Sequence, residues 1–337
     1  MLEKPDILDE RIITRLQSEY GLHVARLSFL PLGADVNTAV YRLVTRDESA
    51  YFLKLRKGTF DETSVTVPLF LKRLGVQPVI DIVQTSTQQP WAHLDPYKMI
   101  LYPFVEGKNG YQMSLSDQQW VDFGAAFKAI HTAPVPAHIA SRLQRETYTP
   151  RWREMVKAFQ TQAATQVFVD PVAAQLAAFI NTKRTEIDFL IARAEHLAST
   201  LQTLAPDFVL CHSDIHAGNL LISPNGAFYI VDWDNPILAP KERDLMYING
   251  GVGQVWDGER IEALFYQGYG YTPIDRTALA YYRYERIIQD IADFADQLLS
   301  SDEGGEDRQQ GLQFCMSNFL PGHEIDFARS TDVRTGG

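Results

Sequence analysis

Cysteine is almost absent from this 337-residue chain, which contains only Cys211 and Cys315. The two lie far apart in the sequence, and neither has a neighbour at metal-ligand spacing, which argues against a disulfide framework and a zinc site. No apolar run is long enough to span a bilayer. The first residues alternate charged and apolar side chains, unlike a secretion signal. These absences predict a protein of the reducing cytoplasm with no membrane partner.

Positive charge is also scarce. The chain has 31 Lys and Arg residues against 42 Asp and Glu residues, which gives a formal net charge of −11, and the basic residues form no dense patch. Because nucleic-acid binding relies on clustered positive charge, nucleic acid is a poor candidate partner. Such a field would attract a cationic ligand, although many ordinary enzymes are acidic too.

The chain changes character after about residue 105, from strand-like to helical patterns. Helices are expected at about residues 7–20, 64–74, 116–131, 171–203 and 274–300. Runs rich in β-branched and aromatic residues predict strands within 22–57, 78–83, 97–105 and 207–232. An apolar content of 45% is sufficient for a sizeable core. We therefore expect an α+β fold with two lobes, a β-rich N-lobe at residues 1–104 and a helical C-lobe at residues 105–337.

The densest group of polar residues lies in the segment CHSDIHAGNLLI, directly after an apolar run. Asp214 precedes Asn219 by five residues, and a later apolar segment, FYIV, ends at Asp232. Asparagine and aspartate supply hard oxygen ligands for Mg²⁺ and leave one carboxylate to accept a hydroxyl proton, as phosphoryl transfer from a nucleotide requires. The alternative is a structural turn, since Asp and Asn also satisfy free backbone N–H groups.

The segments HSDIHAGNLL and IVDWD resemble the catalytic loop and metal-binding motif of the aminoglycoside phosphotransferase family, whose fold is similar to that of protein kinases. The resemblance covers most of the chain and is closer still to spectinomycin phosphotransferases, through GADVNTAVYRL, KLRKG, YTPRWRE, APKERDLM and YYRYERIIQDIADF. It implies that Asp214 is the catalytic base, that Asn219 and Asp232 hold magnesium, and that ATP is the donor. It also implies phosphorylation of spectinomycin or a close aminocyclitol antibiotic, and hence resistance.

A nucleotide site in the N-lobe needs a positive charge and a cover for the phosphates. Lys54 lies within an apolar strand pattern, where an ammonium is costly unless it meets an anion; the resemblance implies that it binds the α- and β-phosphates. Gly33, Asp35 and Asn37 lie between two expected strands, where backbone N–H groups can face phosphate oxygens. Glu62 is the nearest candidate partner for Lys54, or equally a solvated acid in the first turn of a helix.

The segment MILYPFVEG, at residues 99–107, is the expected hinge between the lobes. In kinase-like folds adenine hydrogen-bonds to the backbone of this segment, which suggests Leu101, Tyr102 and Phe104. Pro103 has no N–H and can offer only its carbonyl. The competing interpretation is an aromatic strand end that packs as ordinary core.

The acceptor has to lie beside Asp214, and several C-lobe residues suit an amine-bearing aminocyclitol. Carboxylates bind amines through charge-assisted hydrogen bonds, and aromatic faces bind them through cation–π contacts. The candidates are His216, Asp234, Trp256, Tyr282, Glu285 and Arg286. Each also has a packing or ion-pair interpretation, and Asp234 is alternatively a second metal ligand or a helix cap.

Two other functions stay open at this stage. The same fold could phosphorylate a metabolite such as choline, a sugar or an amino acid. The chain could also be a nucleotide-binding pseudokinase, although pseudokinases commonly lack one of the groups that Lys54, Asp214, Asn219 and Asp232 supply here.

Overall fold

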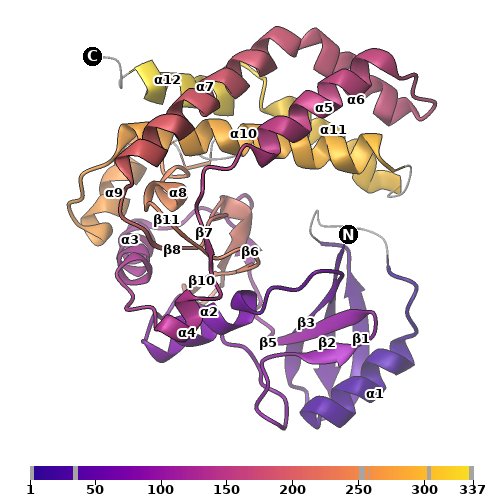
Figure 1. Cartoon of the computed structure of the whole chain (residues 1–337). Helices are drawn as coiled ribbons and strands as arrows, with labels where there is room; N and C mark the ends of the chain where they lie inside the picture. Colours follow the sequence, from indigo (N-terminus) through magenta and orange to yellow (C-terminus); the bar gives the residue numbers. More distant parts are fainter. Residues whose placement is uncertain (1–3, 33–36, 250–254, 257, 302–304, 334–337) are drawn as a thin grey trace.

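The N-lobe is built on a five-stranded antiparallel sheet with the strand order β1-β2-β3-β5-β4 (Figure 1). The computed structural model describes residues 4–32, 37–249, 255–256, 258–301 and 305–333. The strands are β1 (Val24–Leu30), β2 (Thr38–Thr45), β3 (Ala50–Lys57), β4 (Ala92–Leu94) and β5 (Tyr97–Pro103). The predicted boundary after residue 104 falls directly behind β5.

The two faces of this sheet have different environments. Helix α1 (Asp9–Tyr20) packs on one face through Ile12 and Leu16, against Leu53 and its apolar neighbours on the sheet. Because successive side chains of a strand point to opposite faces, Lys54 is directed to the other side. There Val65 of α2 (Thr63–Arg73) belongs to one hydrophobic cluster with Ile82 and with Ile100 of β5. The strand alternation thus directs one buried lysine away from the α1 core.

Short strands, which Figure 1 shows beneath the large helices of the C-lobe, frame the polar segments identified in the sequence. One small sheet has the order β10-β9-β6 and the other the order β7-β11-β8. Their bounds are β6 (Lys108–Asn109), β7 (Gln144–Arg145), β8 (Val209–Cys211), β9 (Leu220–Ile222), β10 (Phe228–Ile230) and β11 (Ile237–Ala239), with a short 3₁₀ helix η1 (Ala217–Asn219) before β9. The segment 212–219 therefore joins β8 to β9, and residues 231–236 join β10 to β11.

Helices make up the rest of the C-lobe, and α10 runs through the middle of them (Figure 1). They are α3 (Asp117–His131), α4 (Ala137–Ala140), α5 (Arg151–Thr165), α6 (Pro171–Thr182), α7 (Arg184–Leu204), α8 (Glu242–Leu245), α9 (Glu259–Tyr269), α10 (Arg276–Leu299), α11 (Gly305–Ser317) and α12 (Glu324–Val333). Helix α10 packs against α5, α7 and α12. The predicted α+β class with a β-rich N-lobe and a helical C-lobe is confirmed.

Two helix predictions differ in their outcome. The helix expected from residue 116 does begin there, because Ser116 and Gln119 form a capping box in which each side chain bonds to the other's backbone N–H. The single helix expected at 171–203 is instead two helices, α6 and α7, separated at Lys183. Helix α6 packs chiefly against α5, whereas α7 packs chiefly against α10, so the chain changes direction between them.

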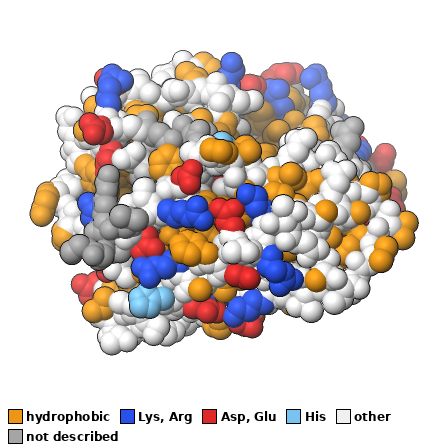
Figure 2. Space-filling view, turned by 90° about the horizontal axis from the view of Figure 1, so that it is seen from above, with side chains coloured by type: hydrophobic (Ala, Val, Ile, Leu, Met, Phe, Trp, Pro, Cys, Tyr) orange, Lys and Arg blue, Asp and Glu red, His pale blue; other side chains and the backbone are white. Residues whose placement is uncertain are grey.

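On the face that Figure 2 shows, charges are mixed rather than gathered by sign. Figure 2 shows one face of the molecule, on which basic and acidic side chains alternate with apolar ones. Among the residues that the structure describes, no helix is both long and apolar enough to cross a membrane.

Helices α3 and α9 cross with their backbones in direct contact at two glycines. A Cβ atom added to Gly268 would lie 1.7 Å from the carbonyl oxygen of Val121, and one added to Gly124 would lie 1.9 Å from that of Phe265. Real Cβ atoms do not approach backbone oxygens this closely, so any larger residue at either position must push the helices apart. This crossing holds α3 and α9 together behind the candidate site.

We expect Gly268→Ala to destabilise the protein by roughly 2 kcal/mol or more, because the overpacked crossing has to open. The sign of this change in the free energy of unfolding is informative, because a Gly→Ala substitution within an exposed helix usually stabilises a protein by up to about 1 kcal/mol. Gln267→Ala, on the exposed side of the same turn, is the matched control and should leave stability unchanged. Urea unfolding followed by circular dichroism compares the three proteins. An unchanged midpoint for Gly268→Ala would contradict the close crossing.

Candidate active site

The segment 212–219 is held from beneath by Asp244 of α8. One carboxylate oxygen of this fully buried residue accepts the backbone N–H of His212 at 2.9 Å, and the other accepts that of Ser213 at 2.7 Å. The Nε2 atom of His131, on α3, lies 3.0 Å from the first oxygen. A buried carboxylate is tolerated when such donors surround it. Asp244 therefore fixes the start of the loop that carries Asp214.

The same support brings three possible metal ligands together. Ligand atoms of His131, Cys211 and Asp244 lie within 4.8 Å of one another. Each group is already hydrogen-bonded: the Cys211 thiol faces the Ala239 and Pro240 carbonyls at 3.7 and 3.6 Å. His131 Nδ1 pairs with the Tyr269 hydroxyl at 2.8 Å. Burial raises the pKa of the Cys211 thiol, which disfavours the thiolate that binds metals, so the cluster is a structural support.

Asp214 receives its closest contacts from outside its own loop. Its Oδ1 accepts a hydrogen bond from Arg286 Nη1 at 2.5 Å and another from the Tyr247 hydroxyl at 3.1 Å. Burial by itself would raise the pKa of Asp214, but the Arg286 guanidinium outweighs it and holds the pKa below its ordinary value. The Asp214 carboxylate is therefore ionised at neutral pH.

Asn219 and His216 lie on the other side of Asp214. Asn219 Nδ2 donates to the Asp214 backbone oxygen at 2.7 Å and lies 3.5 Å from Oδ2. Because the amide nitrogen is used in this way, the amide oxygen of Asn219 stays available as a ligand. His216 Nε2 lies 3.9 Å from Asp214 Oδ2, and its ring stacks on Tyr111 at a centroid distance of 6.0 Å. The structure thus brings Asp214, His216 and Asn219 together.

Lys54 connects the N-lobe sheet to the segment after β10. Its Nζ atom lies 2.7 Å from Asp232 Oδ1 and 2.7 Å from Asp234 Oδ1, and Arg56 also pairs with Asp234. Burial would lower the pKa of Lys54, but the two carboxylates outweigh it and raise the pKa above its ordinary value. Asp232 has a φ of 64°, the left-handed region in which an aspartate is uncommon and which clusters at functional sites. The phosphate-binding candidate and the metal candidate are thus direct neighbours.

The expected pair between Glu62 and Lys54 is not formed. Glu62 immediately precedes α2, and its carboxylate lies 3.2 Å from Arg142 Nη1 in a largely exposed ion pair. An acid at the first turn faces solvent and the helix N-terminus rather than the sheet. Helix α2 itself contains no glutamate, and Asp232 and Asp234 occupy the position beside Lys54 instead.

Two backbone groups of the expected hinge have partners within the protein. The Leu101 carbonyl accepts from the Val83 N–H at 2.8 Å, and the Phe104 N–H donates to the Ala50 carbonyl at 3.0 Å. The Phe104 N–H is therefore used within the protein in this conformation, whereas the Leu101 carbonyl has a second lone pair that could still accept a hydrogen bond. Tyr102 faces the Lys54 side of the sheet, where burial raises the pKa of its hydroxyl against the opposing effect of Lys54.

The phosphate-cover prediction falls partly outside the described part of the chain. Gly33 and Asp35 lie outside the described residues. Asn37 lies directly before β2, and its backbone carbonyl accepts from the Lys57 N–H at 2.8 Å.

Trp256 is a core residue rather than an acceptor contact, which corrects the prediction for it. Its side chain is buried, and its ring makes edge contacts of 5.4 Å with both Trp120 and Phe123 of α3. Large aromatic rings gain most when they are buried against other rings, and α3 offers that surface here.

Helix α10 carries three predicted acceptor residues, of which only Arg286 reaches Asp214. Tyr282 is fully buried, 5.1 Å from the Tyr281 ring and beneath the Arg243 guanidinium. Glu285 is buried beside Arg153 at 3.6 Å, and burial raises its pKa to about 7. The amphipathic pattern of the helix could not distinguish the face that packs against neighbouring helices from the face that meets the loop.

Three residues of the site were not singled out from the sequence. Arg56 follows Lys54 by two positions and so shares its face of β3, a signal that the strand period contains. Tyr247 follows Asp244 by three positions, in the turn after a short helix, which places it near the same loop. Tyr111 has no local signal, because it meets His216 from 105 residues away.

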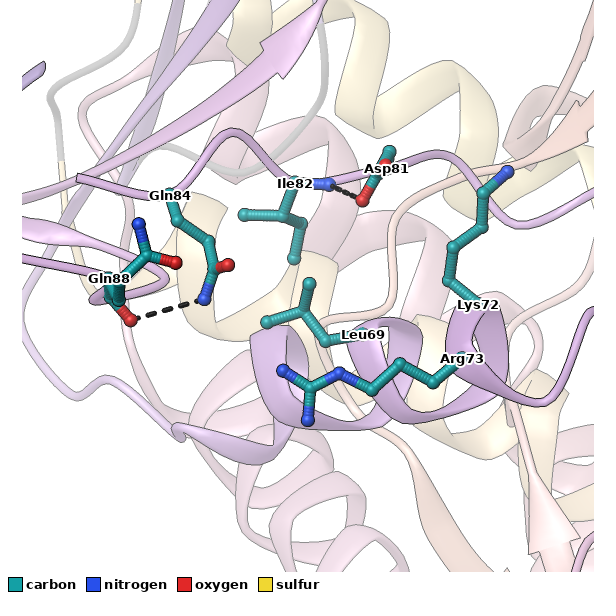
Figure 3. A pocket seen from close by; sticks show the side chains of 7 residues that line it. All are labelled: Leu69, Lys72, Arg73, Asp81, Ile82, Gln84 and Gln88. Atoms are coloured by element: carbon teal, nitrogen blue, oxygen red, sulfur yellow. Dashed lines mark hydrogen bonds between the residues drawn. The ribbon is translucent and has the colours of Figure 1, made fainter. Parts of the chain in front are cut away.

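A separate pocket of about 450 Å³ lies between α2 and the segment that follows it (Figure 3). Figure 3 shows the Gln84 amide directed at the Gln88 carbonyl and the Asp81 carboxylate at the Ile82 N–H. The pocket is lined by Leu69, Lys72, Arg73, Asp81, Ile82, Gln84 and Gln88. None of these residues belongs to the site around Asp214 and Lys54.

Solved structures resemble this chain over nearly its whole length. A crystal structure of spectinomycin phosphotransferase APH(9)-Ia in complex with ADP and spectinomycin is 36% identical, with a TM-score of 0.90, covering 97% of this chain and 99% of that chain. An AMP-bound complex of the same enzyme gives 35% identity and a TM-score of 0.86 at the same coverage. Choline kinase LicA from Streptococcus pneumoniae shares the fold at 15% identity and a TM-score of 0.56, covering 92% of this chain and 98% of that chain.

The family follows from two independent comparisons. Residues 28–282 match the model of the phosphotransferase enzyme family. The 36% identity to spectinomycin phosphotransferase extends over 97% of the chain. A further comparison, with curated proteins, gave no match. The chain therefore belongs to the phosphotransferase enzyme family.

Proposed function

We propose that this protein transfers the γ-phosphoryl group of ATP to a hydroxyl of spectinomycin or a close aminocyclitol. The observation that carries the proposal is the ionised Asp214 beside Asn219, with Lys54 and Asp232 paired nearby. The 36% identity to an enzyme solved with ADP and spectinomycin supports the choice of donor and acceptor. Two unpaired cysteines, Cys211 and Cys315, suit the cytoplasmic location that we propose with it.

The donors on the C-lobe side fit magnesium. Asn219 uses its amide nitrogen in a hydrogen bond and keeps its amide oxygen available. Asp232 pairs with Lys54 through Oδ1, and its side chain is 47% exposed. Carboxylate and amide oxygens are the hard ligands that Mg²⁺ prefers. When bound there, magnesium offsets the negative charge of the nucleotide phosphates.

The protein's own groups divide the reaction between them. Lys54 binds phosphate oxygens of ATP, exchanging part of its contact with Asp232 and Asp234 for them. Asp214 orients the acceptor hydroxyl and accepts its proton while the hydroxyl oxygen bonds to the γ-phosphorus and the bond to ADP breaks. The phosphorylated drug carries added charge and bulk, which we propose weakens its action and confers resistance.

Acceptor identity is tested by ADP release from purified protein with ATP and Mg²⁺. We expect strong stimulation by spectinomycin and little by choline, homoserine or kanamycin. Stimulation by one of those compounds instead would keep the phosphotransfer chemistry and overturn the acceptor. ATP binding without ADP release for any compound would favour the pseudokinase alternative. The likeness to choline kinase, at 15% identity, shows the fold alone.

A further inference from the structure

The two carboxylate oxygens of Asp214 have unequal surroundings. Oδ1 accepts hydrogen bonds from Arg286 Nη1 at 2.5 Å and from the Tyr247 hydroxyl at 3.1 Å. Within the described part of the chain, Oδ2 has no donor this close: Asn219 Nδ2 lies at 3.5 Å and His216 Nε2 at 3.9 Å. One oxygen therefore already accepts two hydrogen bonds, and the other has room for a further donor.

The two donors to Oδ1 are themselves fixed in place. The Tyr247 side chain is buried, and its oxygen lies 3.1 Å from Arg286 Nη1, so the two donors also contact one another. Arg286 Nε lies 2.9 Å from Asp290 Oδ1, one turn further along α10. A planar guanidinium held at two edges by carboxylates has little freedom to rotate. The orientation of Asp214 is thus set by the buried helix α10.

We propose that Arg286 and Tyr247 are positioning residues for phosphoryl transfer, which hold Asp214 Oδ1 so that Oδ2 meets the acceptor hydroxyl. The inference rests on the proposed phosphotransferase activity but not on the identity of the acceptor. It gives Arg286 a role different from the acceptor contact expected from the sequence. Because the guanidinium occupies Oδ1, Oδ2 is the oxygen of Asp214 that can meet the acceptor.

Steady-state kinetics of three variants test the proposal. Arg286→Ala should lower kcat roughly 100-fold, since a misoriented base loses the near-attack geometry, while KM for ATP and for the acceptor stay close to wild type. Tyr247→Phe, which removes one of the two bonds to Oδ1, should lower kcat by about 10-fold. Arg286→Lys keeps the charge but not the two-edged geometry and should lie between these values. Added ethylguanidinium should partly restore kcat of Arg286→Ala.

Arg142→Ala is the matched control, because it removes an exposed arginine that pairs with Glu62 away from the site, and its kinetics should be unchanged. A raised acceptor KM with normal kcat for Arg286→Ala would overturn the proposal and make Arg286 an acceptor contact. Normal kcat in both Arg286→Ala and Tyr247→Phe would also overturn it. If Arg286→Ala fails to fold by circular dichroism, Tyr247→Phe decides alone.

The acceptor does not have to be known for this test. Slow hydrolysis of ATP by water also needs an oriented base, so ADP release without any acceptor should fall in Arg286→Ala and Tyr247→Phe. If spectinomycin does not stimulate ADP release by the wild-type protein, the proposed acceptor is wrong. A loss of basal ADP release in the two variants would still support the positioning role, and unchanged basal release would overturn it.

Discussion

Replacing Asp214 with asparagine should lower kcat by about 1000-fold, within the range that a positioned general base contributes. The asparagine keeps the size of the side chain and can still accept from Arg286 and Tyr247 through its oxygen. It cannot accept the hydroxyl proton, because its second terminal atom is an NH₂ group. The loss should therefore fall on the chemical step rather than on the fold.

ATP binding separates this expectation from a general loss of structure. Because Lys54 and Asp232 are unaltered in the Asp214→Asn protein, its ATP affinity, measured by calorimetry, should stay within about threefold of wild type. Single-turnover phosphoryl transfer then reports the chemical step directly. Normal turnover in this variant would show that Asp214 is not the base and would remove the proposed mechanism.

Replacing Lys54 with methionine should lower kcat/KM for ATP by about 100-fold or more, as removing a charged donor from a preorganised site does. Lys54 pairs with both Asp232 and Asp234, with each contact at 2.7 Å. Without the ammonium, the phosphates lose a cation, and Asp232 and Asp234 repel each other more strongly, although Arg56 still pairs with Asp234. The variant should therefore lose both activity and stability.

A second substitution separates these two effects. In the protein that combines Lys54→Met with Asp234→Asn, one of the opposed carboxylates is neutral, so we expect the thermal unfolding midpoint to recover towards wild type. The value of kcat/KM should stay low, because the ammonium is still missing. Recovery of activity together with stability would instead show that Lys54 acts only as a structural ion-pair partner.

The chemistry of the site could be predicted from local sequence, because the groups that define it lie within short segments. Asp214 and Asn219 share one loop, and Asp232 ends the following strand pair. Lys54 could be identified because an ammonium inside an apolar strand needs an anion. The structure brings an anion to it from 178 residues away, in the form of Asp232.

The surroundings of these groups could not be predicted in the same way. Arg286 was recognised as one charged residue of an amphipathic helix, but its contact with Asp214 spans 72 residues and depends on how α10 packs. Trp256 was expected to face the acceptor, yet ring burial against α3 decides its position. The Glu62 expectation failed because the helix pattern gives no direction for a residue before its first turn. The partners of these side chains depend on tertiary packing, which cannot be inferred from the pattern of one sequence.

The most direct test is mass spectrometry of spectinomycin after incubation with the protein, ATP and Mg²⁺, with the Asp214→Asn protein in parallel. We expect the wild-type protein to convert spectinomycin to a product heavier by one phosphoryl group, with one ADP formed for each product molecule. The Asp214→Asn protein should form almost none. ADP formation without phosphorylated spectinomycin, or equal product from both proteins, would contradict the account.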